Sequence, residues 1–141
     1  MTFLIVLLLL MVIAGSGAAA WYLLRQRELS RRRELSRFWI RALSGSLEGK
    51  RFPIEGEQRL GRDGGRCTVV FPAAAQAVSP LHCKLVAHEK ELLLEDCLSA
   101  GGTYLNGWRL DPFVPMKLKN GDSFTLSQSQ ERFCVEVFFD D

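Results

Sequence analysis

The first 24 residues contain no Asp, Glu, Lys or Arg, and residues 3–14 are almost entirely aliphatic or aromatic. This absence of charge excludes an ordinary soluble amino terminus. An uncharged run of about twenty residues can cross a bilayer core of roughly 30 Å at about 1.5 Å of rise per residue. The pattern therefore predicts a transmembrane helix over residues 1–24, with membrane contact through residues 2–24.

Basic residues are also missing before the apolar run, whereas seven arginines and only two glutamates follow it between residues 25 and 41. The alternative to an anchor is a cleaved signal peptide, for which Ala18-Ala19-Ala20 supplies a small-residue site. The missing amino-terminal cations and the arginines that follow favour an uncleaved anchor. By the positive-inside rule, these arginines stay in the cytoplasm. We therefore expect a single-pass protein of the plasma membrane, with residues 25–141 facing the cytoplasm.

Residues 25–41 contain a short duplication, in which Arg-Glu-Leu-Ser-Arg occurs twice. Good helix formers dominate it, so a basic juxtamembrane helical stalk is predicted. Gly15 and Ala19 form a small-x-x-x-small pair that allows a helix-mediated dimer, although a tolerated patch of small residues near the bilayer edge is the favoured interpretation. Residues 42–141 hold eleven of the 18 basic and fourteen of the 16 acidic residues, and this acidic balance argues against nucleic acid.

From Ala42 onward the sequence lacks a helical period and consists of short β-type runs separated by turn residues. About ten such runs occur in some hundred residues, which predicts an all-β antiparallel sandwich over residues 42–141. Connections this short leave no room for parallel crossovers. Asn106-Gly107 is a strong hairpin signal. The last run places Phe133, Val135 and Val137 on one predicted face.

The chain has no Cys-x-x-Cys pair, which disfavours a zinc site. Its four cysteines are Cys67, Cys83, Cys97 and Cys134. In a cytoplasmic domain thiols stay reduced, so they are predicted to be buried apolar fillers. If the domain faced outward, a secreted disulfide protein would be the alternative.

An acid–base pair or metal cluster with usable spacing is missing as well, so the sequence indicates no enzyme and no cofactor. Ser79 and His82 have no nearby carboxylate to orient the imidazole. Arg62, Ser79 and the turn at Ala100, Gly101 and Gly102 instead offer a guanidinium, a hydroxyl and backbone amides in loops. That set of donors suits an anion with several acceptor oxygens, above all a phosphate.

The order of these motifs resembles a forkhead-associated (FHA) domain of the bacterial, membrane-anchored type. The motifs are Gly61-Arg62, Ser79-x-x-His82, and Asp96 followed by Ser99-x-x-Gly102-Thr103-x-x-Asn106-Gly107. The resemblance spans roughly residues 42–139. It implies a sandwich of eleven strands, of the SMAD/FHA-like class, whose loops bind phosphothreonine peptides.

By this resemblance Arg62, Ser79, Ala100 and Gly101 would bind the phosphopeptide. The structural motif would consist of Gly61, His82, Thr103, Asn106 and Gly107. The implied partner is a phosphothreonine-containing protein, such as a Ser/Thr kinase or its substrate. The chain would then be a membrane-anchored signalling or assembly adaptor.

The sequence departs from the family pattern in two places. Gly101 stands where FHA domains usually have an asparagine that holds the bound peptide, and Pro80 stands where a polar residue is common. These departures motivate the alternative of a phosphorylation-independent interaction or scaffold domain on the membrane.

Overall fold

The computed structural model describes residue 5 and residues 15–28 and 37–138. The chain divides into two compact units, residues 1–35 and 36–141. In the first unit, residues 15–28 are helical, so the helix continues across the predicted boundary at Leu24. The Arg25 guanidinium lies 5.0 Å from the centre of the Trp21 ring, and Gln26 Nε2 donates to Tyr22 Oη at 3.2 Å.

Within the described residues, no helix is both long and apolar enough to cross a membrane. Apart from Ile5, the aliphatic run at residues 3–14 lies outside the described residues, as does the stalk at residues 29–36. The transmembrane helix therefore stays a prediction.

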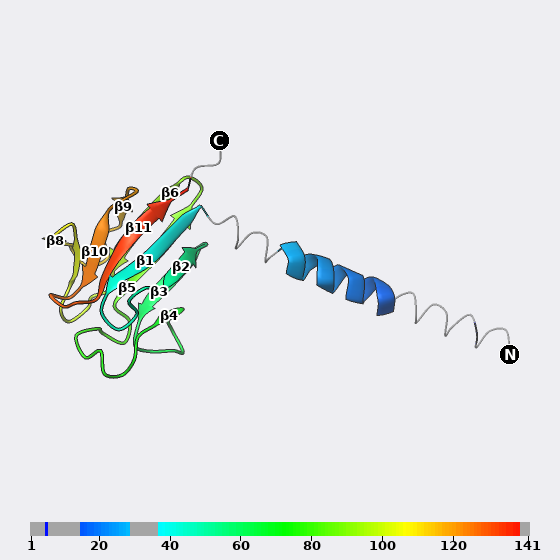
Figure 1. The fold of residues 1–141 in the computed structure, drawn as a ribbon, viewed down its shortest axis with the longest axis horizontal. Helices are drawn as coiled ribbons and strands as arrows, with labels where there is room; N and C mark the ends of the chain where they lie inside the picture. The colour runs from blue at the N-terminus through cyan, green and yellow to red at the C-terminus, as the bar shows by residue number, and fades with distance from the viewer. Residues whose placement is uncertain (1–4, 6–14, 29–36, 139–141) are drawn as a thin grey trace. The chain divides into compact units, whose positions relative to one another are not determined.

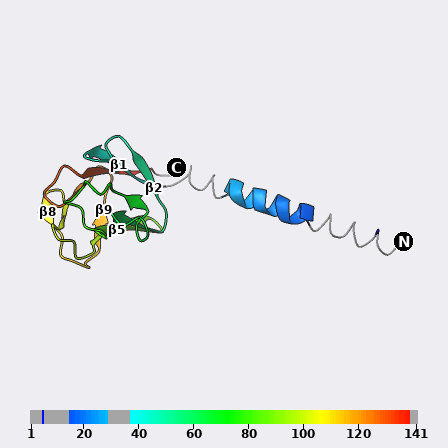
Figure 2. The ribbon, with the colours of Figure 1, turned by 90° about the horizontal axis from the view of Figure 1, so that it is seen from below.

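The second unit is a β-sandwich of two sheets, which form the two layers in Figure 1. The strands are β1 (Phe38–Ser44), β2 (Arg51–Ile54), β3 (Glu57–Gly61), β4 (Val69–Val70), β5 (Cys83–His88), β6 (Glu91–Asp96), β7 (Thr103–Leu105), β8 (Trp108–Arg109), β9 (Met116–Leu118), β10 (Ser123–Leu126) and β11 (Arg132–Val137). The six-stranded sheet has the order β2-β1-β11-β10-β7-β8, and the five-stranded sheet has the order β4-β3-β5-β6-β9. Figure 2 shows β1 and β2 on one side of the sandwich, with β5 and β9 on the other. The predicted two-sheet, all-β fold is confirmed.

The core fills the space between the sheets because one residue in two along most strands points inward. Phe133 and Val135 of β11 are fully buried, as the alternation predicted. Phe124 stacks on Phe133 with ring centres 5.2 Å apart, and Phe71 meets the Phe133 ring edge-on at 6.0 Å.

The predicted start of the sandwich at residue 42 is wrong, because β1 already begins at Phe38. Residues 38–41 were assigned to the helical stalk, yet they pair with both β11 and β2. The physical reason is the alternation within Phe38-Trp39-Ile40-Arg41. It buries Phe38 and Ile40 in the core and leaves Arg41 outside.

One strand pair also contradicts the expectation of purely antiparallel pairing. β4 runs parallel to β3, with Leu60 opposite Val69 and Gly61 opposite Val70. The connection needs no helix, because a turn held by Asp63 brings the chain back beside β3. Cys67 N–H donates to Asp63 O at 2.9 Å, and Phe71 N–H donates to Gly61 O at 2.9 Å.

The four thiols are free, and Cys67 and Cys83 are buried as predicted. Burial raises the pKa of both thiols. Cys97 and Cys134 are only half-buried, so the prediction was wrong for these two. Cys134 lies between the inward-facing Phe133 and Val135 and therefore points away from the core.

Candidate functional site

Arg62 follows β3 directly and is fixed by the loop that leads to β5. Its backbone N–H donates to Ser79 O at 3.2 Å, and its side-chain Nε donates to Val78 O at 2.5 Å. Among the described residues, the two terminal amino groups of this guanidinium have no hydrogen-bond partner. The neighbouring carboxylate of Asp63 does not neutralise Arg62, because it pairs with Arg66 at 2.7 Å. The hydrogen bond from Arg66 also lowers the pKa of Asp63.

Ser79 joins this loop to the β6–β7 loop. Its Oγ accepts the backbone N–H of Ala100 at 3.0 Å. Because the oxygen accepts that bond, the hydroxyl proton is left to donate outward. The structure thus brings Arg62, Ser79 and Ala100 together, with Gly101 next in the chain.

His82 is fully buried and connects the same two loops from below. Its Nδ1 accepts the backbone N–H of Ser79 at 3.0 Å, and its Nε2 lies 2.8 Å from Gly102 O. An N–H donor on one side and a carbonyl acceptor on the other fix the neutral tautomer with the proton on Nε2. Burial lowers the pKa of the imidazole, which also favours the neutral form. His82 thus joins the two loops through hydrogen bonds to backbone groups of Ser79 and Gly102.

Gly61 lies where two backbones approach closely. A Cβ at this position would collide with the carbonyl of Pro80, and it would lie 2.9 Å from Cys67 Sγ. That carbonyl also accepts Asp63 N–H at 3.0 Å and Cys67 Sγ at 3.3 Å. Only glycine fits here without moving the Pro80 backbone, and with it the adjacent Ser79.

Asp96 is part of the third sequence motif, but the sequence did not predict it as a site residue. Its buried carboxylate organises the β6–β7 loop, because Oδ1 accepts the hydroxyls of Ser99 at 2.5 Å and Thr103 at 2.7 Å. Its Oδ2 accepts Ser99 N–H at 3.2 Å. Asp96, Ser99 and Thr103 therefore hold the ends of the turn that carries Ala100 and Gly101. The sequence signal was a carboxylate followed by two hydroxyl residues within seven positions.

Ser127 is a second residue that the sequence gave no reason to choose. A Cβ on Gly101 would collide with Ser127 Oγ and Cβ, so Ser127 occupies the space beside Gly101. The Ser127 hydroxyl donates to Ala77 O at 2.6 Å, and its N–H donates to Gly102 O at 2.7 Å. An asparagine side chain at position 101 would not fit beside Ser127.

Asn106 and Gly107 form the predicted hairpin turn between β7 and β8, with φ values of 49° and 86°. Asn106 Oδ1 accepts Ser123 N–H at 3.0 Å, and Nδ2 donates to Asp122 Oδ1 at 3.1 Å. These contacts tie the hairpin to the start of β10. Asn106 follows the last residue of β7, whereas Gly102 precedes its first residue, so the two lie at opposite ends of this strand.

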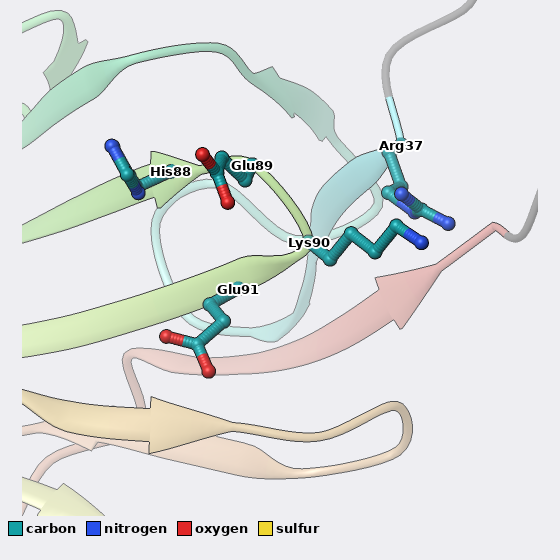
Figure 3. A pocket seen from close by; sticks show the side chains of 5 residues that line it. All are labelled: Arg37, His88, Glu89, Lys90 and Glu91. Atoms are coloured by element: carbon teal, nitrogen blue, oxygen red, sulfur yellow. The ribbon is translucent and has the colours of Figure 1, made fainter.

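A hollow of about 530 Å³ lies near the β5–β6 turn, lined by Arg37, His88, Glu89, Lys90 and Glu91. Figure 3 shows Arg37 and Lys90 extending to the same side, whereas Glu91 points away from them. Glu91 pairs with Lys117 at 2.8 Å. This hollow holds charges of both signs and includes none of the predicted site residues, so it is separate from the loops around Arg62.

The loops around Arg62 present hydrogen-bond donors without a catalytic pair. They offer one guanidinium and a hydroxyl beside an exposed backbone turn, which suits an oxyanion. Both nitrogens of His82 are already bonded to backbone groups. The imidazole is therefore not free to act as a base toward Ser79 Oγ.

Residues 59–127 match the family model of the FHA domain. The chain contains an FHA domain. Human proliferation marker protein Ki-67 is 31% identical over 87 residues, which are 62% of this chain and 2% of that protein. This chain therefore spans only a small part of that relative.

Solved FHA domains share the fold. The FHA domain of CT664 from Chlamydia trachomatis is 20% identical, with a TM-score of 0.64 over 74% of this chain and all of that one. The MEK1 FHA domain is 23% identical, with a TM-score of 0.66 over 80% of this chain and 99% of that one. The MEK1 FHA domain has also been solved with a HOP1 phosphothreonine peptide; there the identity is 24% and the TM-score 0.59, over 72% of this chain and 97% of that one. FHA domains are binding modules, generally without catalysis.

Proposed function

We propose that this chain is a membrane-anchored phosphothreonine reader that acts as a cytoplasmic signalling or assembly adaptor. The observation that carries the proposal is the set of donors around Arg62. Its guanidinium keeps two terminal amino groups for an anion, while Nε fixes the side chain on Val78 O. The Ser79 hydroxyl lies in the adjacent loop and keeps a proton to donate.

Phosphothreonine fits these donors better than a carboxylate does. A phosphate offers three terminal oxygens in a tetrahedron, and a guanidinium together with a hydroxyl can address two of them at once. The fold itself supports a peptide ligand, because the structure of the MEK1 FHA domain includes a phosphothreonine peptide. The partner would be a protein phosphorylated on threonine, such as a Ser/Thr kinase or its substrate.

The anchor is the second part of the proposal. It is supported by the uncharged residues 2–24 and by the arginines at residues 25–41, which would keep the FHA domain on the cytoplasmic side of the plasma membrane. β1 begins at the end of the sandwich that also holds the β5–β6 turn, since Phe38 pairs with Val137 and with Ile54. Arg62, Ser79 and Ala100 lie at the other end of the strands. A tether entering at Phe38 therefore leaves the phosphate loops accessible.

The alternative is an FHA fold that binds its partner without phosphate. The space beside Gly101, where the family has a peptide-holding asparagine, is filled here by Ser127. A domain that has lost this contact could use another surface. The two functions differ in their dependence on Arg62: phosphothreonine binding requires its guanidinium, whereas phosphate-independent binding does not.

The test is retention of the full chain, in detergent, on beads carrying a phosphothreonine peptide library or its unphosphorylated counterpart. We expect retention on the phosphorylated beads and its loss in the Arg62→Ala variant. Arg59→Ala is the matched control, since Arg59 lies three residues earlier and pairs with Glu57 on the outside of the sheet. Equal retention on both kinds of bead, or no effect of Arg62→Ala, would support the phosphate-independent scaffold instead.

A further inference from the structure

The two outer faces of the sandwich differ in charge. On the six-stranded sheet, alternation turns Trp39 and Arg41 outward between the buried Phe38, Ile40 and Ala42. The same alternation and the strand register place four arginines and a single glutamate on this face: Arg41, Arg51, Arg109, Arg132 and Glu136. Their net charge is +3.

The glutamate is already engaged twice. Glu136 pairs with Arg41 at 3.0 Å and with Arg51 at 2.6 Å. One carboxylate shared by two guanidinium groups leaves an excess of positive charge at this point. Arg109 and Arg132 have no carboxylate partner on this face, and Arg132 Nη2 reaches only the hydroxyl of Ser123 at 3.3 Å.

The outer face of the five-stranded sheet is neutral by contrast. Its strands carry three ion pairs: Glu57 with Arg59 at 2.7 Å, Lys84 with Glu95 at 3.1 Å, and Lys117 with Glu91 at 2.8 Å. These six side chains sum to zero charge. The excess of positive charge is therefore a property of one sheet, not of the whole surface.

The charged face also contains a polar groove. A hollow of about 610 Å³ runs along β10 and is lined by Asn106, Gly107, Ser123, Thr125, Ser129 and Arg132. Hydroxyl groups beside one guanidinium suit a phosphate ester. This groove is separate from the loops around Arg62.

Aromatic side chains accompany the arginines on the same face. The Arg51 guanidinium lies 4.8 Å from the centre of the Trp39 ring and 5.9 Å from that of Phe138. Aromatic rings among arginines are typical of the interfacial layer of a bilayer. The first arginine of this face, Arg41, is also the last of the arginine-rich residues 25–41.

We propose that the outer face of the six-stranded sheet docks on an anionic phospholipid bilayer, with a lipid headgroup phosphate in the groove beside Arg132. The choice of a bilayer as occupant rests on the proposed anchor, which would keep the FHA domain at a membrane surface. Charge complementarity supplies the attraction, because each arginine near an anionic leaflet contributes to binding. Docking on this face leaves the loops around Arg62 uncovered.

The test uses the full chain in vesicles of brominated phosphatidylcholine, with or without brominated phosphatidylglycerol. The three tryptophans are Trp21, Trp39 and Trp108. A variant that keeps only Trp39 reports contact of the sheet with lipid through quenching of its fluorescence. A variant that keeps only Trp21 reports the anchor.

We expect Trp39 to be quenched in the anionic vesicles and not in pure phosphatidylcholine. This difference should be lost in an Arg41→Gln, Arg51→Gln, Arg132→Gln variant. It should persist in the matched variant Arg59→Gln, Lys84→Gln, Lys117→Gln, which removes three positive charges from the neutral face.

The proposal would be overturned if the fluorescence of Trp39 were not quenched in anionic vesicles. It would also be overturned if quenching were equal in anionic vesicles and in pure phosphatidylcholine. An acidic protein would then be the better occupant of this face. The anchor is judged separately, since Trp21 would be unquenched in both kinds of vesicle if residues 2–24 did not insert. The Trp39 result decides the docking proposal in either case.

Discussion

His82 couples the two loops of the site through a single neutral ring. Protonation of Nδ1 would remove the acceptor for Ser79 N–H, and burial already lowers the pKa of the imidazole from its usual 6.5. Below about pH 6.5 the unfolded chain therefore binds more protons than the folded one. The free energy of unfolding must then fall as the pH drops through this range.

Chemical denaturation between pH 8 and pH 5 measures this effect. Because a single histidine takes up only one proton, the free energy of unfolding can change by at most about 1.4 kcal/mol per pH unit. His82→Gln keeps one acceptor and one donor but does not titrate, so its stability should depend less on pH. His88→Gln removes the other, exposed histidine and should keep the dependence of the wild type. An unchanged slope in His82→Gln would contradict the lowered pKa of His82.

Gly101 and Ser127 share one space at the rim of the site. An asparagine at position 101 would overpack against Ser127, which we expect to cost about 1–3 kcal/mol. Ser127 has a φ of 59°, so glycine is well suited to its backbone. The Gly101→Asn, Ser127→Gly double variant should therefore be more stable than the sum of the single changes predicts.

Thermal and denaturant unfolding of the wild type, the two single variants and the double variant gives the coupling free energy between positions 101 and 127. The double variant should also bind a phosphothreonine peptide more tightly, because it restores the side chain that the family uses to hold the peptide. Additive effects on stability would show that the two side chains do not compete for this space.

At the scale of elements, the first strand holds the six-stranded sheet together. β1 lies between β2 and β11, and Ile40 is fully buried at its middle. We expect Ile40→Ala to lower the free energy of unfolding by about 2–5 kcal/mol. Arg41→Ala, one position further and exposed, should cost less than about 1 kcal/mol. Equal effects of the two changes would contradict the assignment of residues 38–41 to the sandwich.

Much of this architecture was predictable from local pattern. Strict alternation in β11 and the Asn106-Gly107 turn each gave the correct element, because period and turn chemistry are local properties. The start of β1 was missed because Arg37 and Arg41 continue the basic composition of the preceding residues. The parallel β3–β4 pair was missed because a two-residue strand carries almost no pattern.

In the site, too, residues in local motifs were predictable, whereas contacts between residues far apart in the chain were not. Arg62, Ser79 and His82 were identified by motif, and the structure brings their loops together. Ser127 was not predictable, because its contact with Gly101 joins residues 26 positions apart through the packing of two loops. Asp96 was visible in the motif, yet its role required knowledge of its burial and its hydroxyl partners.

At the scale of the whole molecule, the charges are distributed unevenly. An uncharged first segment is followed by arginines. In the FHA domain, a local excess of positive charge lies on the outer face of the six-stranded sheet, and the phosphate loops lie at one end. The loops of the proposed reader can be altered without touching the anchor or the docking face. Arg41 belongs both to the arginines that follow the anchor and to the docking face, so these two regions adjoin.

The central claim is that Arg62 binds a phosphate on the partner. Calorimetric titration of the wild type and Arg62→Ala with one phosphothreonine peptide and its threonine form gives four affinities and one coupling free energy. A charge-assisted contact predicts a coupling of about 1.5–3 kcal/mol, so that Arg62→Ala weakens only the phosphopeptide, by roughly ten- to a hundredfold. An equal loss for both peptides, or no loss for either, would contradict the account.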